Sequence, residues 1–356
     1  MKKLVSVVAM CLAGAVVPVN AAAQGAHTNP VGLVLSGGGA KGAYEIGVWQ
    51  TLQEVGIASN ITAISGTSVG ALNAALFAAC PDDAEKLWME NVAGAFQVNA
   101  DLVVENVSNM VVEALSARTA DDKSGIDWRR LAKSLYAGVV KKAAGFFSGK
   151  LQEGYLDSSL FAKMLDDKLP QSWPANAAAV YATAVEKGLG GKTRTWRINS
   201  EPHERRILML RASAAIPFGF DSVSIDGKNY IDAGFEFKAC GMKILDGDNV
   251  PLQPIIDSHP EIRTVIVVYL ADKEHIDKKR REKNQLAADA AKVRLLEIIP
   301  SKNIGISLQK VGGNWKVGGA VDTSPERVRE LIDLGRKDAR EALAKAGLEK
   351  YVEVNK

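Results

Sequence analysis

Short apolar runs alternate with stretches of helical periodicity in the first part of the chain. Residues 31–35 are a continuous apolar run, which predicts a buried strand, and residues 61–64 are predicted to be a second short strand. Each run is followed by a helical stretch, at residues 44–54 and 71–79, that carries an apolar stripe or is almost entirely apolar. Strand–turn–helix units of this kind predict a three-layer α/β/α fold with a mainly parallel central sheet.

Further strands and two more polar helical regions follow along the chain. Strands are predicted in four more segments: residues 178–185, 193–198, 223–231 and 262–270. The third of these contains an Asp-Gly pair and is predicted to be a hairpin. We expect one domain over residues 31–271, with a helical insertion at about 84–170. Residues 272–356 are expected to be a mostly helical extension, with a helix near 324–349, packed on or beside that domain.

The first 23 residues have the three parts of a secretory signal peptide. A positively charged start precedes an apolar run over residues 4–17, and three alanines at 21–23 offer a cleavage site. A helix over that run would reach about 21 Å, short of the roughly 30 Å core of a bilayer, so a permanent span is not expected. We therefore expect an exported protein, periplasmic or secreted, in which residues 24–30 form a short tail.

The composition of the chain excludes several classes of protein. Lys and Arg number 44 against 41 Asp and Glu, and no basic stretch carries interleaved aromatic residues, so no nucleic-acid partner is expected. Three cysteines in 356 residues exclude a disulfide framework. Cys80 and Cys240, which remain after the leader, could still pair in an oxidising compartment. Hydrophobic residues make up 47% of the chain, enough for a large core.

The glycine-rich turn after the first predicted strand is the first candidate site. Gly37, Gly39 and Gly42 match G-x-G-x-x-G between a strand and a helix, which is the context of dinucleotide binding. Such a site also needs an acidic residue after the second strand, and residues 55–69 contain none. Together with Gly38, these glycines can instead present backbone N–H groups that hold the negative oxygen of a tetrahedral intermediate. A dinucleotide-binding enzyme remains the alternative.

The turn after the second predicted strand carries a candidate nucleophile. Its sequence, Gly66-Thr67-Ser68-Val69-Gly70, is G-x-S-x-G between a strand and a helix, which is the context of a nucleophile elbow. The glycines let the strand and the helix approach each other without steric conflict. The serine hydroxyl then projects beside a helix N-terminus that favours negative charge. Ser68 is therefore predicted to be the nucleophile.

The base that such a serine needs is harder to find, because the chain has only four histidines. Of these, His259 is the one fair candidate for a catalytic triad. The better candidate is Asp232, at the end of the predicted hairpin. A carboxyl with a pKa of about 4 is a weak base at neutral pH. We therefore expect burial to raise its pKa and a hydrogen bond with the serine to align the proton transfer.

These three motifs, in this order, resemble those of the patatin-like phospholipases, of the bacterial, secreted type. The resemblance covers about residues 31–271 and includes the segment 211–217, which is similar to the family's A-S-x-A-x-P. It implies a dyad of Ser68 and Asp232, a phospholipid or other lipid acyl ester as substrate, and neither cofactor nor metal. It assigns the oxyanion donors to Gly37, Gly38 and Gly39. It also implies that six further residues support the motifs: Lys41, Gly42, Gly66, Gly70, Ala233 and Gly234.

The acid motif departs from the family's pattern in two ways. Ala233 stands where the family has glycine, which adds a Cβ next to the base. The asparagine and proline that usually follow closely are Asn249 and Pro251, after an apparent insertion at 235–247. Two expectations stay open: the insertion reshapes the substrate entrance, or the acid is one of two other aspartates, Asp246 and Asp248.

Two segments suggest peripheral contact with a membrane. Residues 131–150 combine an apolar stripe with lysines, which suits either a lipid interface or packing on the chain's own sheet. The charged segment 273–283 is expected to be solvated, although its Lys and Arg side chains could attract anionic head groups. The function expected from the sequence is a serine lipid acyl hydrolase. A catalytically degenerate lipid-binding module is the further alternative.

Overall fold

The computed structural model describes two long stretches of the chain. These are residues 29–92 and 158–348, apart from gaps at 189, 218–219, 235–236, 240–241, 306, 312–313 and 319–323. The expected signal peptide and most of the expected tail lie outside the described residues. So do Cys240 and most of the expected helical insertion, of which only the two ends are described.

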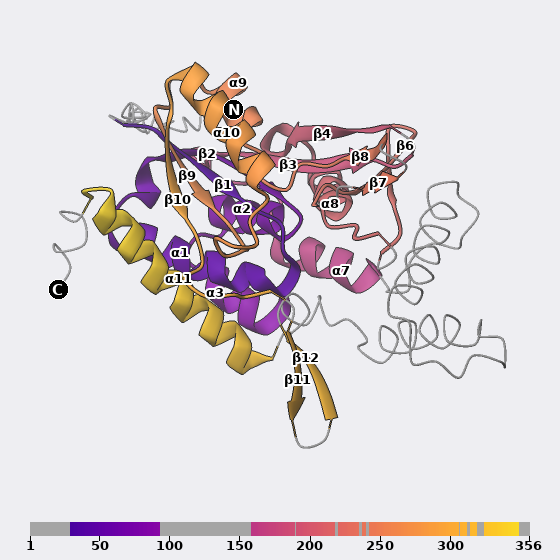
Figure 1. The fold of residues 1–356 in the computed structure, drawn as a ribbon. Helices are drawn as coiled ribbons and strands as arrows, with labels where there is room; N and C mark the ends of the chain where they lie inside the picture. Colours follow the sequence, from indigo (N-terminus) through magenta and orange to yellow (C-terminus); the bar gives the residue numbers. More distant parts are fainter. Residues whose placement is uncertain are drawn as a thin grey trace, which may run out of the picture.

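Ten strands of the described residues form one mixed sheet in the order β10-β9-β1-β2-β3-β4-β8-β7, with β6 beside β3 and β5 beside β6 (Figure 1). Five neighbouring strands, from β10 to β3, are parallel, whereas β4 and β6 run antiparallel to β3. The strand bounds are β1 Val31–Leu35, β2 Ile61–Thr67, β3 Ala179–Glu186, β4 Gly191–Arg197, β5 Val223–Ile225, β6 Lys228–Asp232, β7 Phe237–Ala239, β8 Met242–Asp246, β9 Thr264–Val268 and β10 Arg294–Ile298. The sheet is therefore parallel in its centre and mixed beyond β3.

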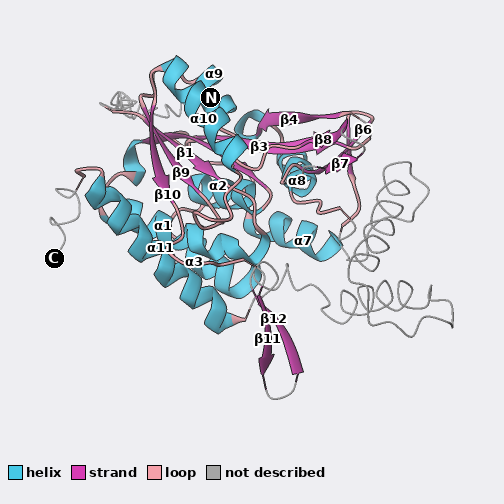
Figure 2. Ribbon diagram, in the orientation of Figure 1, coloured by secondary structure: helices cyan, strands magenta, loops and turns pink. Residues whose placement is uncertain are grey.

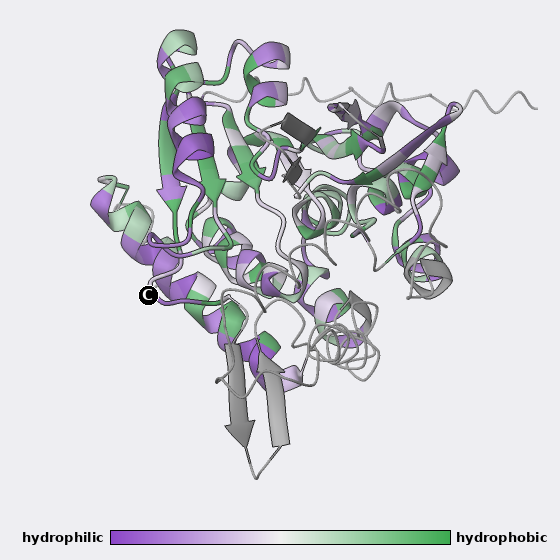
Figure 3. Cartoon of the chain, turned by 45° about the vertical axis from the view of Figure 1, so that its right-hand side comes forward, coloured by the Kyte–Doolittle hydropathy of each residue, from purple (hydrophilic) through white to green (hydrophobic). Residues whose placement is uncertain are grey.

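Helices cover both faces of this sheet, which confirms the three-layer α/β/α prediction (Figure 2). On β1, Leu33 and Leu35 pack in one core cluster with α1, α2, α8 and α11, whereas Val34 packs in another with α9 and α10. The strands between these layers are largely hydrophobic (Figure 3). The helix bounds are α1 Ala43–Glu54, α2 Val69–Ala79, α3 Ala84–Leu87, α7 Ser158–Lys168, α8 His203–Ser213, α9 Gln253–Ser258, α10 Lys278–Ala291 and α11 Pro325–Lys345. Shorter turns are η1 Gly39–Gly42, η2 Ala58–Asn60, η3 Trp88–Val92 and η4 Ile198–Ser200.

The C-terminal region is more closely integrated than the expected extension. Strand β10 joins the sheet beside β9, and α11 lies along α1 (Figure 1). A glycine on each helix permits this contact: a Cβ on Gly47 would overlap the carbonyl oxygen of Ile332, and one on Gly335 would overlap that of Tyr44. The expected extension is therefore not entirely outside the sheet, because its strand β10 pairs with β9 along its whole length.

The described residues form three hairpins, of which one was predicted from the sequence and two were not. The predicted hairpin is β5–β6, and both of its turn residues, Asp226 and Gly227, have positive φ. The apparent insertion at 235–247 forms a second hairpin, β7–β8, whose strand β8 pairs with β4. A third hairpin pairs β11 (Ser307–Val311) with β12 (Asn314–Gly318) in a region where no strand was predicted. Among the described helices, none combines the length and the apolar character that crossing a membrane requires.

Candidate active site

Ser68 forms the tight turn that joins β2 to α2. Its φ of 56° lies in the left-handed region, which is unusual for a residue with a side chain and costs about 1–3 kcal/mol. The two flanking glycines make this turn possible. A Cβ on Gly66 would overlap the backbone of Gly70, and one on Gly70 would overlap the carbonyl oxygen of Leu35. The local geometry is therefore that of the predicted elbow, and Ser68 is 4% exposed within it.

Asp232 lies at the end of β6, where that strand meets the end of β2. Strand β2 pairs with β3 as far as Thr183, and β6 pairs with β3 from Ala184 onward. Because β4 occupies the other edge of β3 at these positions, β2 and β6 share one edge and meet end to end. At this junction the Ser68 side chain is close enough to the Asp232 carboxyl to lower its pKa. The topology thus brings together two residues that are far apart in the sequence.

The environment of Asp232 makes its carboxyl a stronger base than usual. The residue is only 2% exposed, and burial raises its pKa from 3.8 to about 6. Hydrogen bonds from Ser68 and from the Gly234 N–H, which lies 2.7 Å from Oδ1, act in the opposite direction. The expected effect of burial is present, and it places the pKa near the pH at which a general base is most useful.

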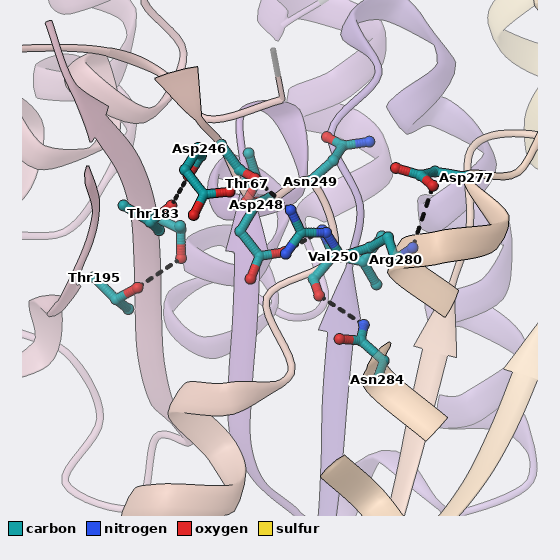
Figure 4. A network of polar contacts seen from close by, with 12 residues as sticks. Thr67, Thr183, Thr195, Asp246, Asp248, Asn249, Val250, Asp277, Arg280 and Asn284 are labelled. Atoms are coloured by element: carbon teal, nitrogen blue, oxygen red, sulfur yellow. Dashed lines mark hydrogen bonds and ion pairs between the residues drawn. The ribbon is translucent and has the colours of Figure 1, made fainter. Parts of the chain in front are cut away.

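The other proposed bases have different partners. His259 contacts the Tyr181 hydroxyl and Glu261, each at 3.0 Å. It also precedes β9 and so lies toward the amino ends of the parallel strands, whereas Ser68 follows the carboxyl end of β2. Asp248 forms an ion pair with Arg280 at 3.3 Å (Figure 4). Asp246 ends β8 and is exposed.

The N–H of Gly37 is occupied, which differs from the expectation that it serves as an oxyanion donor. It donates to Asn249, at 3.0 Å to the side-chain oxygen and 3.3 Å to the backbone oxygen. The Asn249 amide in turn donates to the Gly37 carbonyl oxygen at 3.3 Å. No hydrogen bond between described residues uses the N–H of Gly38 or Gly39. These two groups are therefore the available donors of the glycine loop.

A buried polar network fixes the other end of the glycine loop. Asn73 on α2 donates to the Gly42 carbonyl oxygen at 3.0 Å and to Glu45 at 2.7 Å, and it accepts from the Trp88 indole at 2.6 Å. Burial raises the pKa of Glu45 well above its ordinary value. Lys41 donates to the Leu270 carbonyl oxygen at 2.7 Å, and burial lowers its pKa. The motif glycine and lysine thus anchor the loop to α2 and to the end of β9.

The departure at Ala233 is accommodated by a small apolar cluster. Ala233 is 1% exposed and packs with Val185, Ile231 and Leu245. A Cβ at this position is therefore a core contact. At Gly234, by contrast, a Cβ would approach the Asn249 side-chain oxygen to 2.9 Å and Asp232 Oδ1 to 3.0 Å. The loop that follows Asp232, here called the acid loop, therefore tolerates a side chain at Ala233 and disfavours one at Gly234.

Asn249 connects the acid loop with the glycine loop, a role that the sequence did not reveal. The β7–β8 hairpin separates it from Asp232 along the chain, yet it contacts Gly37 and lies close to Gly234. The only available signal was that the family's asparagine was displaced. Asn73 was also missed, because a buried asparagine carries no pattern that identifies its partner. Ser213 belongs to the segment 211–217, which is similar to the family's A-S-x-A-x-P, but that pattern does not identify the partners of its hydroxyl.

A cavity of about 230 Å³ lies beside the glycine loop. Its walls include Gly37, Lys41, Asn249, His275 and Arg280. Figure 4 shows how Arg280 reaches from α10 toward Asp248 next to this region. Within the described ranges, no three His, Cys, Asp or Glu side chains are grouped as metal ligands would be.

Comparison with known proteins places these features in a family. A stretch of 55 residues is 51% identical to a patatin-like phospholipase domain-containing protein of Caenorhabditis elegans, and covers 15% of this chain and 4% of that protein. A stretch of 48 residues is 56% identical to a lysophospholipase of Aspergillus terreus, and covers 14% and 3% of the two chains. The chain thus matches only a small part of these relatives' length.

Comparison with solved structures found similarity at low sequence identity. VipD from Legionella pneumophila is 15% identical, with a TM-score of 0.44, over 89% of this chain and 67% of that one. The family pattern described as Patatin-like phospholipase matches residues 33–252, more than half of the chain. The chain therefore belongs to the patatin-like phospholipase family.

Proposed function

We propose that the protein is a serine lipid acyl hydrolase of the phospholipase A or lysophospholipase type. The observation that carries this proposal is the juxtaposition of Ser68 with Asp232, a buried carboxyl whose pKa is raised to about 6. A nucleophilic serine needs such a partner to remove its proton. The membership of the family supports lipid acyl esters as the substrate class.

The reaction follows from the arrangement of these groups. Asp232 takes the hydroxyl proton as Ser68 Oγ attacks the ester carbonyl carbon. The resulting oxyanion accepts hydrogen bonds from the N–H groups of Gly38 and Gly39, each of which is worth about 3 kcal/mol of barrier in such sites. Asp232 then gives the proton to the departing alcohol, which leaves an acyl group on Ser68. Water, deprotonated by Asp232, attacks the acyl-enzyme and releases the fatty acid.

Labelling with a fluorophosphonate probe, followed by peptide mapping, tests the nucleophile directly. We expect the probe to modify Ser68 and to block release of fatty acid from phosphatidylcholine vesicles and from p-nitrophenyl butyrate. Ser68→Ala should abolish both activities. The matched control is Ser65→Ala on β2, the strand before Ser68, because the buried Ser65 hydroxyl has no hydrogen-bond partner among the described residues. A folded Ser68→Ala variant that keeps full turnover would refute the proposal.

The same assays separate the hydrolase from its alternatives. A degenerate lipid-binding module would bind vesicles without being labelled at Ser68. A dinucleotide-binding enzyme would show a higher melting temperature with NAD, NADP or FAD, which a hydrolase of this kind should ignore. Catalysis in the hydrolase requires neither a cofactor nor a metal, so turnover should persist in EDTA.

We also propose that the protein is exported, in the manner of a bacterial, secreted enzyme, and contacts membranes peripherally. The charged, apolar and small-residue parts of residues 1–23 support export. The substrate class supports membrane contact. Mass spectrometry of the exported protein should find an N-terminus at residue 24, and vesicle flotation should recover bound protein. A retained leader or a cytoplasmic pool alone would contradict export.

A further inference from the structure

The C-terminal end of α8 contacts the backbone of both residues of the proposed dyad. Ser213 is the last residue of α8 and is fully buried. Its hydroxyl accepts a hydrogen bond from the Ser68 N–H at 2.9 Å. Two residues later, the Ala215 carbonyl oxygen accepts a hydrogen bond from the Asp232 N–H at 2.9 Å. One short segment therefore holds the nucleophile and the acid at the same time.

The same hydroxyl also ties this segment to β3. Ser213 Oγ donates to the Thr183 carbonyl oxygen at 2.7 Å. Thr183 is the last β3 residue paired with β2, and Ala184 is the first paired with β6. Ser213 thus contacts β3 at the point where its partner strand changes from β2, which precedes Ser68, to β6, which ends at Asp232. Its hydroxyl therefore connects the turn of Ser68 with β3, the strand that pairs with both β2 and β6.

The backbone of Ser68 needs such a partner. With φ at 56°, the residue lies between β2 and α2. Its carbonyl oxygen accepts hydrogen bonds from the N–H groups of Ala71 and Leu72 at the start of α2, but its own N–H has no partner in the strand or the helix. Its N–H is buried, and the serine hydroxyl is the partner that satisfies it. Loss of the hydroxyl would leave the buried Ser68 N–H without this partner and would remove one hydrogen bond from the Thr183 carbonyl oxygen. The strained turn could then relax, and the nucleophile would move relative to Asp232.

We propose that Ser213 is a positioning residue that holds the Ser68 turn in the geometry needed for attack. The inference rests on the proposed function of Ser68 and Asp232. Ser213 does not touch the ester and takes no proton from it. Its hydroxyl acts through the backbone of Ser68, so its loss should affect the reactivity of the nucleophile more than the binding of substrate.

The test is the rate at which a fluorophosphonate labels Ser213→Ala, together with its kcat and KM on p-nitrophenyl butyrate. We expect the labelling rate and kcat to fall about 10²-fold, as for a reacting group misplaced by about 1 Å. KM should stay within about twofold. Ser213→Cys keeps a weaker acceptor at the same position and should fall between wild type and Ser213→Ala.

Two controls distinguish positioning from loss of stability. Ser65→Ala removes another fully buried serine hydroxyl, one without a partner, and should label like wild type. Leu343→Ala, on α11, lowers the melting temperature by a cavity away from the site and should also label like wild type below that temperature.

The possible outcomes separate this inference from the proposed function. If wild type is labelled and Ser213→Ala is labelled equally fast, the positioning role is wrong and the function stands. If Ser213→Ala does not fold, Ser213→Cys decides, because a wild-type labelling rate in that variant also overturns the inference. If wild type itself is not labelled at Ser68, both the proposed function and this inference fail.

Discussion

If Asp232 is the base, as proposed, its buried carboxyl should make the activity of this protein depend on pH. Burial raises its pKa to about 6, and only the unprotonated form can accept the serine proton. With that pKa, about one tenth of the molecules carry the active form at pH 5 and about nine tenths at pH 7. We therefore expect kcat/KM for a soluble ester to rise about tenfold between these values, with a midpoint near pH 6.

The same carboxyl should lower the stability of the folded chain at neutral pH. Because its pKa is higher in the folded chain than the ordinary 3.8, the folded state binds the proton more tightly than the unfolded state does. Its contribution to the free energy of unfolding is therefore largest below about pH 4 and is lost as the pH rises through about 6. A pKa difference of about 2 corresponds to about 3 kcal/mol. Asp232→Asn should be more stable than wild type by up to this amount at pH 7, and by little at pH 4.

Two measurements test this reasoning together. The first is kcat/KM of wild type on p-nitrophenyl butyrate from pH 4.5 to 8. The second is urea denaturation of wild type and Asp232→Asn at pH 4 and pH 7. Asp226→Asn is the control, because Asp226 is exposed and its pKa is lowered by Arg205, so its loss should bring no gain in stability. An activity midpoint near pH 4, or an Asp232→Asn variant no more stable than wild type at pH 7, would refute the argument from burial.

Three further substitutions probe other parts of the structure. Asn249→Ala removes the side-chain hydrogen bonds to Gly37 and should lower kcat about tenfold in ester assays. An unchanged kcat would show that the glycine loop keeps its conformation without Asn249. Gly335→Ala forces a Cβ against the backbone of α1 and should reduce the free energy of unfolding in urea by about 1–3 kcal/mol or more; full stability would contradict the close helix contact. His259→Ala should keep ester hydrolysis within about twofold, and loss of activity in a folded variant would return this histidine to the site.

The sequence by itself determined the local parts of this site. The glycine loop and the serine turn are short segments between a strand and a helix, and steric demands on consecutive residues decide their shape. Gly66 and Gly70 lie within two residues of Ser68, and the structure shows that a Cβ on either would overlap neighbouring backbone. The order of apolar runs also predicted the layers, because each buried strand must be covered on both faces.

Only the tertiary structure decided how these parts work together. The meeting of β2 and β6 on one edge of β3 brings Asp232 to Ser68 and leaves His259 toward the other end of the parallel strands. The return of Asn249 to Gly37 depends on a hairpin that the sequence presented as an insertion. The Ser213 hydroxyl accepts a hydrogen bond from Ser68, which lies 145 positions away in the sequence. A hydrogen bond across such a separation depends on strand pairing, and a single buried polar residue leaves no periodic trace of its partner in the sequence.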